Sequence, residues 1–509
     1  MTEGWVLMSK FKAALGVHCR GAFLVGIVVL IMSCSGQQKP VAKDTAGAAG
    51  VAPTWLAGDH HVHSRFSVGW DREQDPPAPI VGGDAIYPIP MNALMARHYG
   101  LGWMVTTDHG GPEHSRVTRD WAHPALLRSR TVVPDLLQYH GLELNSPGGD
   151  HATLIVPRSN EEAAQLYQYE TAYDRNETWP HDGSRNNTPL MVSALKEMGA
   201  AEQVPVVIAN HPSRSGSASS PYGLYSPAEL RTWNDAAPHV AVGFAGAPGH
   251  QAITLAPDGA VIPDRPRGGY VWQVTRGGFD PMTAKLGGLW DSLLGEGRKW
   301  WITANSDSHR HYTELGGDFW PGEYSKTWVH AAPEYDAVLE GLRQGRMFVA
   351  TGDLITGLSM TLVVDNRARE IWPGDTVTLR DSEPFSLTVS VIDPSGPNAG
   401  GRTLEVARLD LIVGDISGLA PTPDQDTNPS ARVIARFSRS QMQIGGELLT
   451  ARWDGVADGH FYVRLRGTNT DELEPEPDPR GENPWDDLWF YSNPFFVDTL
   501  QTSGGSEQL

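Results

Sequence analysis

Short apolar runs recur between residues 55 and 347, and each run lies next to a polar or ionisable residue. Uninterrupted apolar runs of this length are typical of strands buried on both faces, as in parallel sheets. The intervening segments 91–98 and 191–198 have apolar residues at helical spacing, which predicts helices. Buried parallel strands with polar residues at their carboxyl ends predict a β/α barrel with its site on one face. The runs span residues 55–57, 101–105, 139–142, 152–156, 204–209 and 300–304.

The pattern changes near residue 354, after an amphipathic helix predicted at 334–346. From there, short alternating runs are separated by Gly, Pro, Asp and Asn, a spacing typical of an antiparallel β-sandwich. We therefore expect an α/β barrel domain at 54–353, a β-sandwich domain at 354–500 and a disordered tail at 501–509. The predicted sandwich strands are 358–364, 385–392, 409–413, 433–437, 448–453, 460–466 and 488–497.

Residues 1–33 have the features of an export signal, because basic residues precede an apolar stretch at 21–32. This stretch is shorter than the about 20 residues that span a bilayer. It ends in Ile-Met-Ser-Cys, which resembles a bacterial lipobox and implies a lipid on Cys34; a cleaved signal without lipid and a plain anchor are the alternatives. Residues 34–53 are small and polar, which predicts a flexible tether. We expect an exported lipoprotein of the bacterial cell envelope, periplasmic or at the outer membrane, that contacts the membrane through this lipid.

Composition narrows the range of partners and chemistries. The chain has 40 basic and 60 acidic residues and a net charge of −20, so its surface repels nucleic acid, and no nucleic-acid polymer is expected as a partner. Two cysteines exclude a disulfide scaffold. Thiol chemistry is also excluded, because Cys19 leaves with the signal and Cys34 carries the lipid.

Histidines and carboxylates at the ends of the apolar runs predict a metal site. His61 and His63 are two residues apart, so in a strand both rings point to the same side and can reach one ion. Alone the pair is a weak signal in a chain with 18 histidines. Imidazoles and carboxylates together suit zinc, manganese or iron(II), and eight ligands are too many for one ion, so we expect two or three. The other ligand-type residues are His109, Glu143, His151, His211, Asp307 and His309.

These residues lie in five motifs that together resemble the PHP (polymerase and histidinol phosphatase) family of metal-dependent hydrolases. The motifs are Gly-Asp-His-His-Val-His-Ser at 58–64, Thr-Thr-Asp-His at 106–109, Gly-Leu-Glu at 141–143, Asn-His-Pro at 210–212 and Asn-Ser-Asp-Ser-His at 305–309. The resemblance implies a distorted seven-stranded (β/α)7 barrel with two or three metal ions at its C-terminal face. It implies that one ion is held by His61, His63, Glu143 and Asp307, that Glu143 bridges to a second ion held by His151 and His211, and that His109 and His309 complete the cluster.

One motif departs from the family. Many members have Ser-Asp-Gly after the paired histidines, with the aspartate on a metal, whereas this chain has Ser67-Val68-Gly69. Asp71 is the expected substitute. The departure puts the third metal in doubt and favours two.

A metal cluster of this kind lowers the pKa of a water and supports ester hydrolysis. The resemblance implies a small-molecule phosphoester substrate, and Asp307 or His309 is expected to move the proton. Arg214 is the predicted phosphate clamp, with Arg65 and Arg310 as further candidates, although each can instead be a surface ion-pair residue. The barrel-and-sandwich order also resembles carbaryl-hydrolase-like members, which makes carbamate and carboxylic esters the alternative substrates. A surface-binding lipoprotein without turnover is the non-enzymatic alternative.

Two long insertions follow predicted strands, at 65–90 and 159–189. Both can cover the site as lids, and the second carries Tyr167, Tyr169, Tyr173 and Trp179, which would suit an apolar group on the substrate. The alternative is that both insertions only pack on the rim of the barrel.

Overall fold

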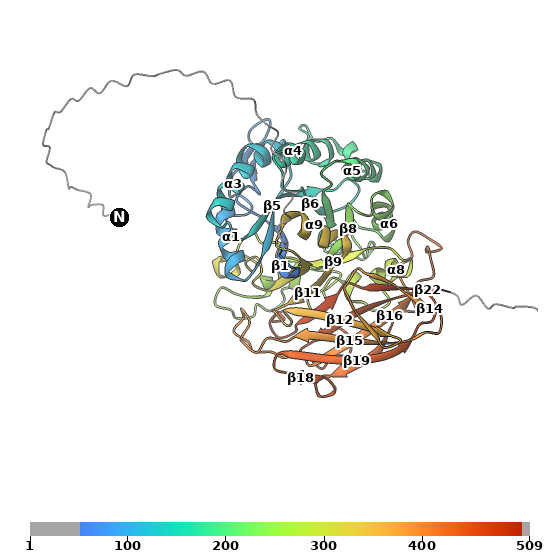
Figure 1. The fold of residues 1–509 in the computed structure, drawn as a ribbon. Helices are drawn as coiled ribbons and strands as arrows, with labels where there is room; N and C mark the ends of the chain where they lie inside the picture. The colour runs from blue at the N-terminus through green and yellow to red at the C-terminus, as the bar shows by residue number, and fades with distance from the viewer. Residues whose placement is uncertain (1–50, 501–509) are drawn as a thin grey trace, which may run out of the picture. The chain divides into compact units, whose positions relative to one another are not determined.

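A large mixed sheet lies at the centre of the fold, which a computed structural model describes for residues 51–500 (Figure 1). The predicted signal at 1–33, Cys34, most of the tether and the tail at 501–509 lie outside the described residues. Among residues 51–500, no helix is long and apolar enough to cross a membrane.

Seven strands between residues 54 and 304 form one continuous part of this sheet, in the order β1-β4-β5-β6-β7-β8-β9. Neighbouring strands are parallel except at β6, which is antiparallel to both β5 and β7. The prediction of parallel strands is therefore wrong for β6. The bounds are β1 Thr54–Val62, β4 Trp103–His109, β5 Leu137–Asn145, β6 His151–Ile155, β7 Val206–Ala209, β8 Ala241–Ala247 and β9 Trp301–Ala304.

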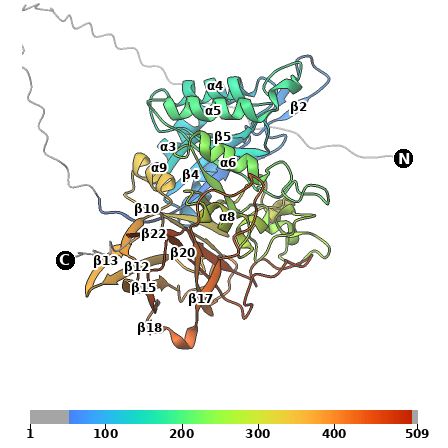
Figure 2. The same ribbon diagram turned by 90° about the vertical axis from the view of Figure 1, so that its right-hand side faces the viewer.

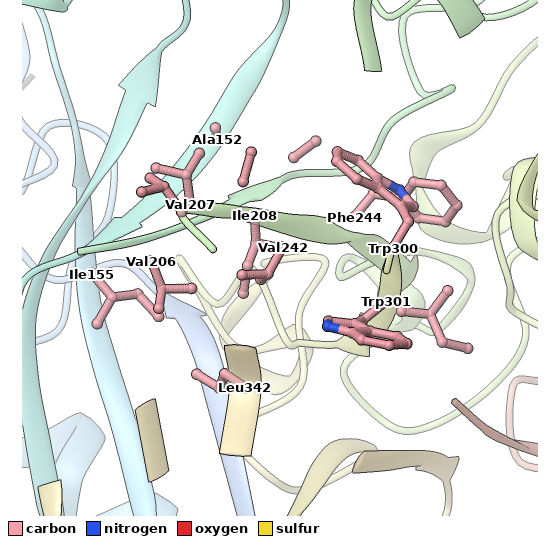
Figure 3. Close-up of a cluster of buried hydrophobic side chains, with 14 of the residues drawn as sticks. Ala152, Ile155, Val206, Val207, Ile208, Val242, Phe244, Trp300, Trp301 and Leu342 are labelled. Atoms are coloured by element: carbon pink, nitrogen blue, oxygen red, sulfur yellow. The ribbon is translucent and has the colours of Figure 1, made fainter. Parts of the chain in front are cut away.

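The apolar runs form these strands because both faces of the sheet are buried. Every residue of β7 and β9 is buried. Figure 3 shows Val206, Val207 and Ile208 of β7 beside Phe244 and Trp301 of the next two strands. Two buried faces explain why hydrophobic residues follow one another without alternation.

Strand β8 has no apolar run of the kind that marks the others. Its sequence, Ala-Val-Gly-Phe-Ala-Gly-Ala, is rich in small residues. A Cβ on Gly243 would lie 1.9 Å from the carbonyl oxygen of Trp301, so the close approach of β9 requires glycine there. The bulky residues by which the other strands were found are thus excluded by packing.

The two ends of the seven-strand series meet at one edge. The segment after β9 returns to β1, where Asp307 N donates to His61 O at 3.1 Å and His63 N donates to Ser308 O at 3.1 Å. A parallel bridge joins Val62 to Ser308. On its other side β1 pairs antiparallel with β10 (Ser325–Ala331). Residues of the predicted site therefore lie where the first and last strands come together.

Helices cover the outside of the strands, as Figure 1 shows for α3 to α6 around β5, β6 and β8. The helices predicted at 91–98, 191–198 and 334–346 are confirmed by α1, α5 and α9. The first insertion carries a hairpin of β2 (Gly69–Asp71) and β3 (Ala78–Ile80). The helices are α1 Ile89–His98, α2 His114–Val117, α3 His123–Val132, α4 Glu162–Tyr173, α5 Thr188–Ala200, α6 Pro227–Ala236, α7 Pro281–Ala284, α8 Leu289–Gly295 and α9 Tyr335–Gln344.

The C-terminal strands extend the large sheet and add a second one. The large sheet continues from β10 through β11, β21, β20, β22 and β14. Strand β16 also pairs with β20, and β17 pairs with β16. Strand β14 is parallel to β22 rather than antiparallel. The bounds in this part are β11 Met347–Thr351, β14 Thr376–Arg380, β16 Arg408–Asp415, β17 Arg432–Ser438, β20 Phe461–Thr468, β21 Trp489–Ser492 and β22 Phe495–Leu500. The antiparallel second sheet, in the order β13-β12-β15-β19-β18, contains β12 Gly357–Val364, β13 Arg367–Ile371, β15 Pro384–Ile392, β18 Gln443–Gly445 and β19 Leu448–Val456.

The two sheets share one hydrophobic core, with Leu387 of β15 and Leu411 of β16 in the same cluster. Figure 2 shows β12 and β15 on the side of β20 and β22 away from α4 and α5. Strand β11 pairs with both β10 and β21, so backbone hydrogen bonds cross the predicted boundary at residue 353. A buried ion pair adds to this connection, because Arg464 of β20 donates to Asp291 of α8 at 2.8 and 2.9 Å.

Candidate metal centre

All eight predicted metal ligands converge at one edge of the seven-strand series. Parallel strands place their carboxyl ends there, and β6, which runs the opposite way, places its first residue there. That reversal explains why His151 begins its strand, whereas the other ligands lie near or after the ends of theirs. By strand, the ligands are His61 and His63 with β1, His109 with β4, Glu143 with β5, His151 with β6, His211 after β7, and Asp307 and His309 after β9.

Glu143 lies at the centre of the cluster and is fully buried. Three imidazole nitrogens approach its Oε1 and two approach its Oε2. The contacts to Oε1 are His61 Nε2 at 3.1 Å, His211 Nε2 at 3.2 Å and His151 Nδ1 at 3.4 Å, and those to Oε2 are His109 Nδ1 at 2.8 Å and His63 Nε2 at 3.4 Å.

Asp307 is the second buried carboxylate of the cluster, and its two oxygens face different groups. Its Oδ1 lies 3.1 Å from His63 Nε2 and 3.4 Å from His61 Nε2. Its Oδ2 accepts a hydrogen bond from Arg214 Nη1 at 2.7 Å and lies 3.2 Å from His250 Nε2. The backbone of Asp307 is left-handed, with φ of 50°, a strained conformation of the kind that clusters at functional sites.

The geometry of these contacts fits cations. Five imidazole nitrogens lie within 3.4 Å of the oxygens of the buried Glu143, and His109 Nδ1 is the nearest at 2.8 Å. A buried carboxylate among this many nitrogens is unfavourable unless positive charge, from protons or metal ions, lies between them. Nitrogen and carboxylate oxygen are the donors that zinc, manganese and iron(II) accept. The predicted ligands form three groups of three, and within each group the ligand atoms lie within 4.8 Å of one another. The groups are His61 with His63 and Asp307, His109 with Glu143 and His151, and His63 with His109 and His309.

The electrostatics keep the carboxylates ionised. Burial raises the pKa of Glu143, but the rings of His61, His151 and His109 outweigh burial and hold that pKa well below its usual value. For Asp307, burial also raises the pKa, while His250, His61 and Arg214 lower it further than burial raises it. Burial together with the neighbouring rings of His309 and His109 lowers the pKa of His63. Ionised carboxylates are the form in which Glu143 and Asp307 bind a metal. Burial lowers the pKa of His61 and His151, but Glu143 outweighs burial and raises both pKa values, that of His151 to about 9, so a bound metal would displace protons from these rings.

A hydrogen-bonded chain behind the cluster orients His63. Its Nδ1 lies 2.7 Å from Ser67 Oγ, which donates to Asp108 Oδ1 at 3.3 Å. Asp108 also accepts hydrogen bonds from Ser64 N at 2.6 Å and Ser64 Oγ at 2.9 Å. Such partners fix the ring orientation of a metal-binding histidine. Ser67 therefore orients a predicted ligand, although the next residue is Val68 and not the aspartate that many PHP members have at this position.

Asp84, and not Asp71, is the carboxylate that the first insertion brings to the cluster. Its Oδ2 lies 3.5 Å from His309 Nε2 and 3.8 Å from His109 Nε2. The expectation for Asp71 is wrong, because that carboxylate accepts hydrogen bonds from Glu73 N and Gln74 Nε2 on the exposed hairpin. The preceding Gly83 explains the placement: a Cβ there would lie 2.7 Å from the backbone nitrogen of Gly69. Only the folded insertion shows which aspartate reaches the histidines.

A cavity of about 300 Å³ opens onto the cluster, and every residue that lines it is polar or charged. Three of its residues, Asp150, Ser215 and His250, were not among the predicted site residues. The lining residues are His109, Glu143, Asp150, His151, His211, Arg214, Ser215, His250, Asp307 and His309.

Arg214 reaches this cavity as predicted, and it is already partly engaged. Besides the contact with Asp307, its Nε donates to Gly268 O at 3.2 Å. Its Nη2 is buried and has no hydrogen-bond partner among residues 51–500, so one donor group of the guanidinium is unpaired beside the cavity. Arg65 and Arg310 are exposed and do not line the cavity.

The aromatic residues of the second insertion do not form the expected lid. Tyr169 and Tyr173 belong to α4 and are buried in the main hydrophobic core. Trp179 is partly exposed, and its Nε1 donates to Asp75 Oδ1 of the first insertion at 2.6 Å. The two insertions therefore contact each other through this hydrogen bond. Tyr169 and Tyr173 pack against the fold, which agrees with the alternative that the insertions only pack on the rim.

The sequence matches no protein-family model, and it matches no curated protein. The residues of the site are therefore the guide to function.

Proposed function

We propose that this protein is an exported, metal-dependent hydrolase of the PHP family that cleaves a phosphoester bond in a small molecule. The observation that carries the proposal is the polar cavity, in which six of the eight predicted ligands lie beside a guanidinium with a buried nitrogen that has no hydrogen-bond partner among residues 51–500. An unpaired donor group buried beside a metal-type ligand cluster suits a substrate that is itself an anion.

We also propose that the seven strands from β1 to β9 are the distorted barrel implied by the resemblance. The strand order and the backbone bonds between the segment after β9 and the end of β1 support this. So does the position of the ligands at the carboxyl ends of the parallel strands, where barrel enzymes have their active sites.

The proposed cofactors are two or three divalent ions of zinc, manganese or iron, held by His61, His63, His109, Glu143, His151, His211, Asp307 and His309. When bound, such ions supply Lewis acidity, which lowers the pKa of a water and polarises the ester. Asp84, which lies beside His109 and His309, supports a third ion. It supplies a carboxylate in place of the aspartate that many PHP members have at the position of Val68.

The chain itself binds and orients the substrate. In the proposed reaction, Arg214 Nη2 donates to a non-bridging phosphoryl oxygen, while Nη1 stays on Asp307 and fixes the direction of the guanidinium. Glu143 and Asp307 balance the positive charge of the site. The proton-transfer role expected of Asp307 or His309 stays a prediction.

The proposed location is the bacterial cell envelope, with the lipid on Cys34 as the contact with the membrane. Residues 51–53, the part of the predicted tether that the structure describes, are exposed.

Hydrolysis assays on metal-reconstituted protein test the function. Phosphomonoester, phosphodiester, carbamate and carboxylic-ester substrates with the same aryl leaving group are compared at equal concentration. We expect faster turnover of a phosphoester than of the neutral esters, and we expect Glu143→Gln to lose this phosphoester turnover. The exposed His239, whose ring is hydrogen-bonded only to Gly199 O among residues 51–500, serves as a control through His239→Ala. Preference for the carbamate or carboxylic ester would replace the substrate class, and metal binding without any turnover would favour the binding lipoprotein.

A further inference from the structure

His250 lies against the metal cluster and is not among the residues of the resembling motifs. It follows β8 and has a left-handed backbone, with φ of 59°. The preceding Gly249 touches the segment after β9 so closely that a Cβ there would lie 2.2 Å from both Asp307 Cβ and Ser306 O. His250 N also donates to Ser306 O at 3.3 Å. A strained residue held this tightly beside a cluster of ligands points to a functional role.

One buried carboxylate orients the ring of His250. His250 Nδ1 lies 2.5 Å from Asp318 Oδ1. The other oxygen of Asp318 accepts hydrogen bonds from His309 N at 2.7 Å and Arg310 N at 2.9 Å. Asp318 is thus an acceptor on both oxygens, so Nδ1 of His250 carries the proton and donates it to Asp318. The same carboxylate holds the backbone of His309, a predicted ligand.

The other ring nitrogen faces the cluster. His250 Nε2 lies 3.2 Å from Asp307 Oδ2, and 26% of the side chain is exposed, toward the cavity. Within residues 51–500, the hydrogen bond of this ring is the one to Asp318. A ring held through Nδ1 by a carboxylate presents Nε2 to the cavity beside Asp307, where this nitrogen can bind a cation.

We propose that His250 Nε2 is a further ligand of the centre and holds a divalent transition-metal ion together with Asp307 and His309. The ligand atoms of these three residues lie within 4.8 Å of one another. A ring nitrogen that donates to a carboxylate while the other faces the metal is the usual arrangement of metal-binding histidines. Asp307 Oδ2 also accepts from Arg214, which is compatible because each carboxylate oxygen has two lone pairs.

Cobalt titration of the metal-stripped full-length protein tests this inference, which rests on the proposed metal binding but not on hydrolysis. The readouts are cobalt stoichiometry by mass spectrometry of the metal, affinity, and the visible absorption of the bound cobalt. We expect His250→Ala to lose one bound cobalt ion, or to bind it at least about tenfold more weakly, and to change the visible absorption. Asp318→Asn keeps the ligand but loses its orienting charge, and is expected to weaken the same ion by about 10- to 100-fold.

Two comparisons separate ligation from a structural effect. His239→Ala is the matched control and should keep the stoichiometry and spectrum of the wild type. Free imidazole should restore the lost cobalt to His250→Ala and leave the wild type unchanged, because it replaces the missing ligand. If His250→Ala does not fold, His250→Gln and Asp318→Asn are titrated instead, with thermal unfolding as the check.

The outcomes distinguish this inference from the proposed function. Unchanged cobalt stoichiometry, affinity and absorption in a folded His250 variant would overturn the inference and leave the eight-ligand centre intact. A wild type that binds cobalt through His250 but hydrolyses none of the esters would support the inference and overturn the hydrolase. A wild type that binds no cobalt would overturn both.

Discussion

Replacement of Arg214 by alanine tests the phosphoester assignment directly. The side chain is 18% exposed, its Nη1 is bound to Asp307 at 2.7 Å, and its Nη2 is buried without a partner. In the proposed reaction, Nη2 makes a charge-assisted hydrogen bond to the phosphoryl group that strengthens as charge develops. Loss of such a contact costs about 2–4 kcal/mol in the transition state, or roughly 30- to 1000-fold in turnover.

The assay compares kcat/KM for an aryl phosphoester and for a neutral carboxylic ester with the same leaving group. Metal content is measured in the same preparations, because Arg214→Ala also removes the partner of Asp307. Arg214→Lys keeps a positive charge beside Asp307 but lacks the second donor group of the guanidinium, and we expect an intermediate loss. Arg310→Ala is the matched control, since Arg310 is exposed next to a predicted ligand and does not line the cavity.

The specific expectation is a large loss for the phosphoester, a small loss for the neutral ester, and unchanged metal content. A loss below about threefold, which is about 0.6 kcal/mol, would make Arg214 a structural partner of Asp307 only. An equally large loss for the neutral ester would show that the guanidinium acts through the metal centre rather than on the phosphoryl group.

Three further predictions concern the metals, the stability and the anchor. Glu143→Ala should lose more bound metal than His309→Ala, because five imidazoles surround Glu143; equal metal content by mass spectrometry would contradict its bridging role. Burial lowers the pKa of His114, but Glu170 outweighs it and raises the pKa from 6.5 to about 9. This contact should therefore stabilise the fold by up to about 3 kcal/mol below pH 6.5, and the gain should vanish as the pH rises through about 9. Urea unfolding of the wild type and of His114→Gln, at pH 6.5 and at pH 9, measures the difference in their free energies of unfolding. If this difference does not shrink as the pH rises, the stabilising role of the His114–Glu170 contact is contradicted. Cys34→Ser should accumulate as an unprocessed precursor or no longer partition into detergent. Normal processing with unchanged partitioning would contradict the lipid on Cys34, and only the prediction of export would remain.

The sequence alone determined the features that depend on local pattern. Uninterrupted apolar runs identified β7 and β9 because both faces of these strands are buried, and alternating runs identified β12, β15 and β19 in the second sheet. The cluster of predicted ligands could be found from the sequence because each of these residues lies in or shortly after a strand, so that motif and strand end coincide in the chain. His61 and His63 illustrate this, since the two-residue period of a strand places both rings on one side.

Tertiary structure decided what depends on the approach of distant segments. Strand β8 was not found because packing against β9 requires glycine where a bulky residue would have marked a strand. The reversal of β6 and the continuation of the large sheet through β11 into β21 depend on strand pairing, which one strand's composition does not encode.

The site shows the same division. Asp84 and Asp71 are both acidic residues of one insertion, and only the fold of that insertion places Asp84 beside His109 and His309. His250 reaches Asp307 through a glycine contact and a buried partner, Asp318, that lies 68 residues away in the chain. Residue type and spacing determine which side chains can bind a metal, but the position of each side chain in space depends on contacts between segments that the local sequence does not specify.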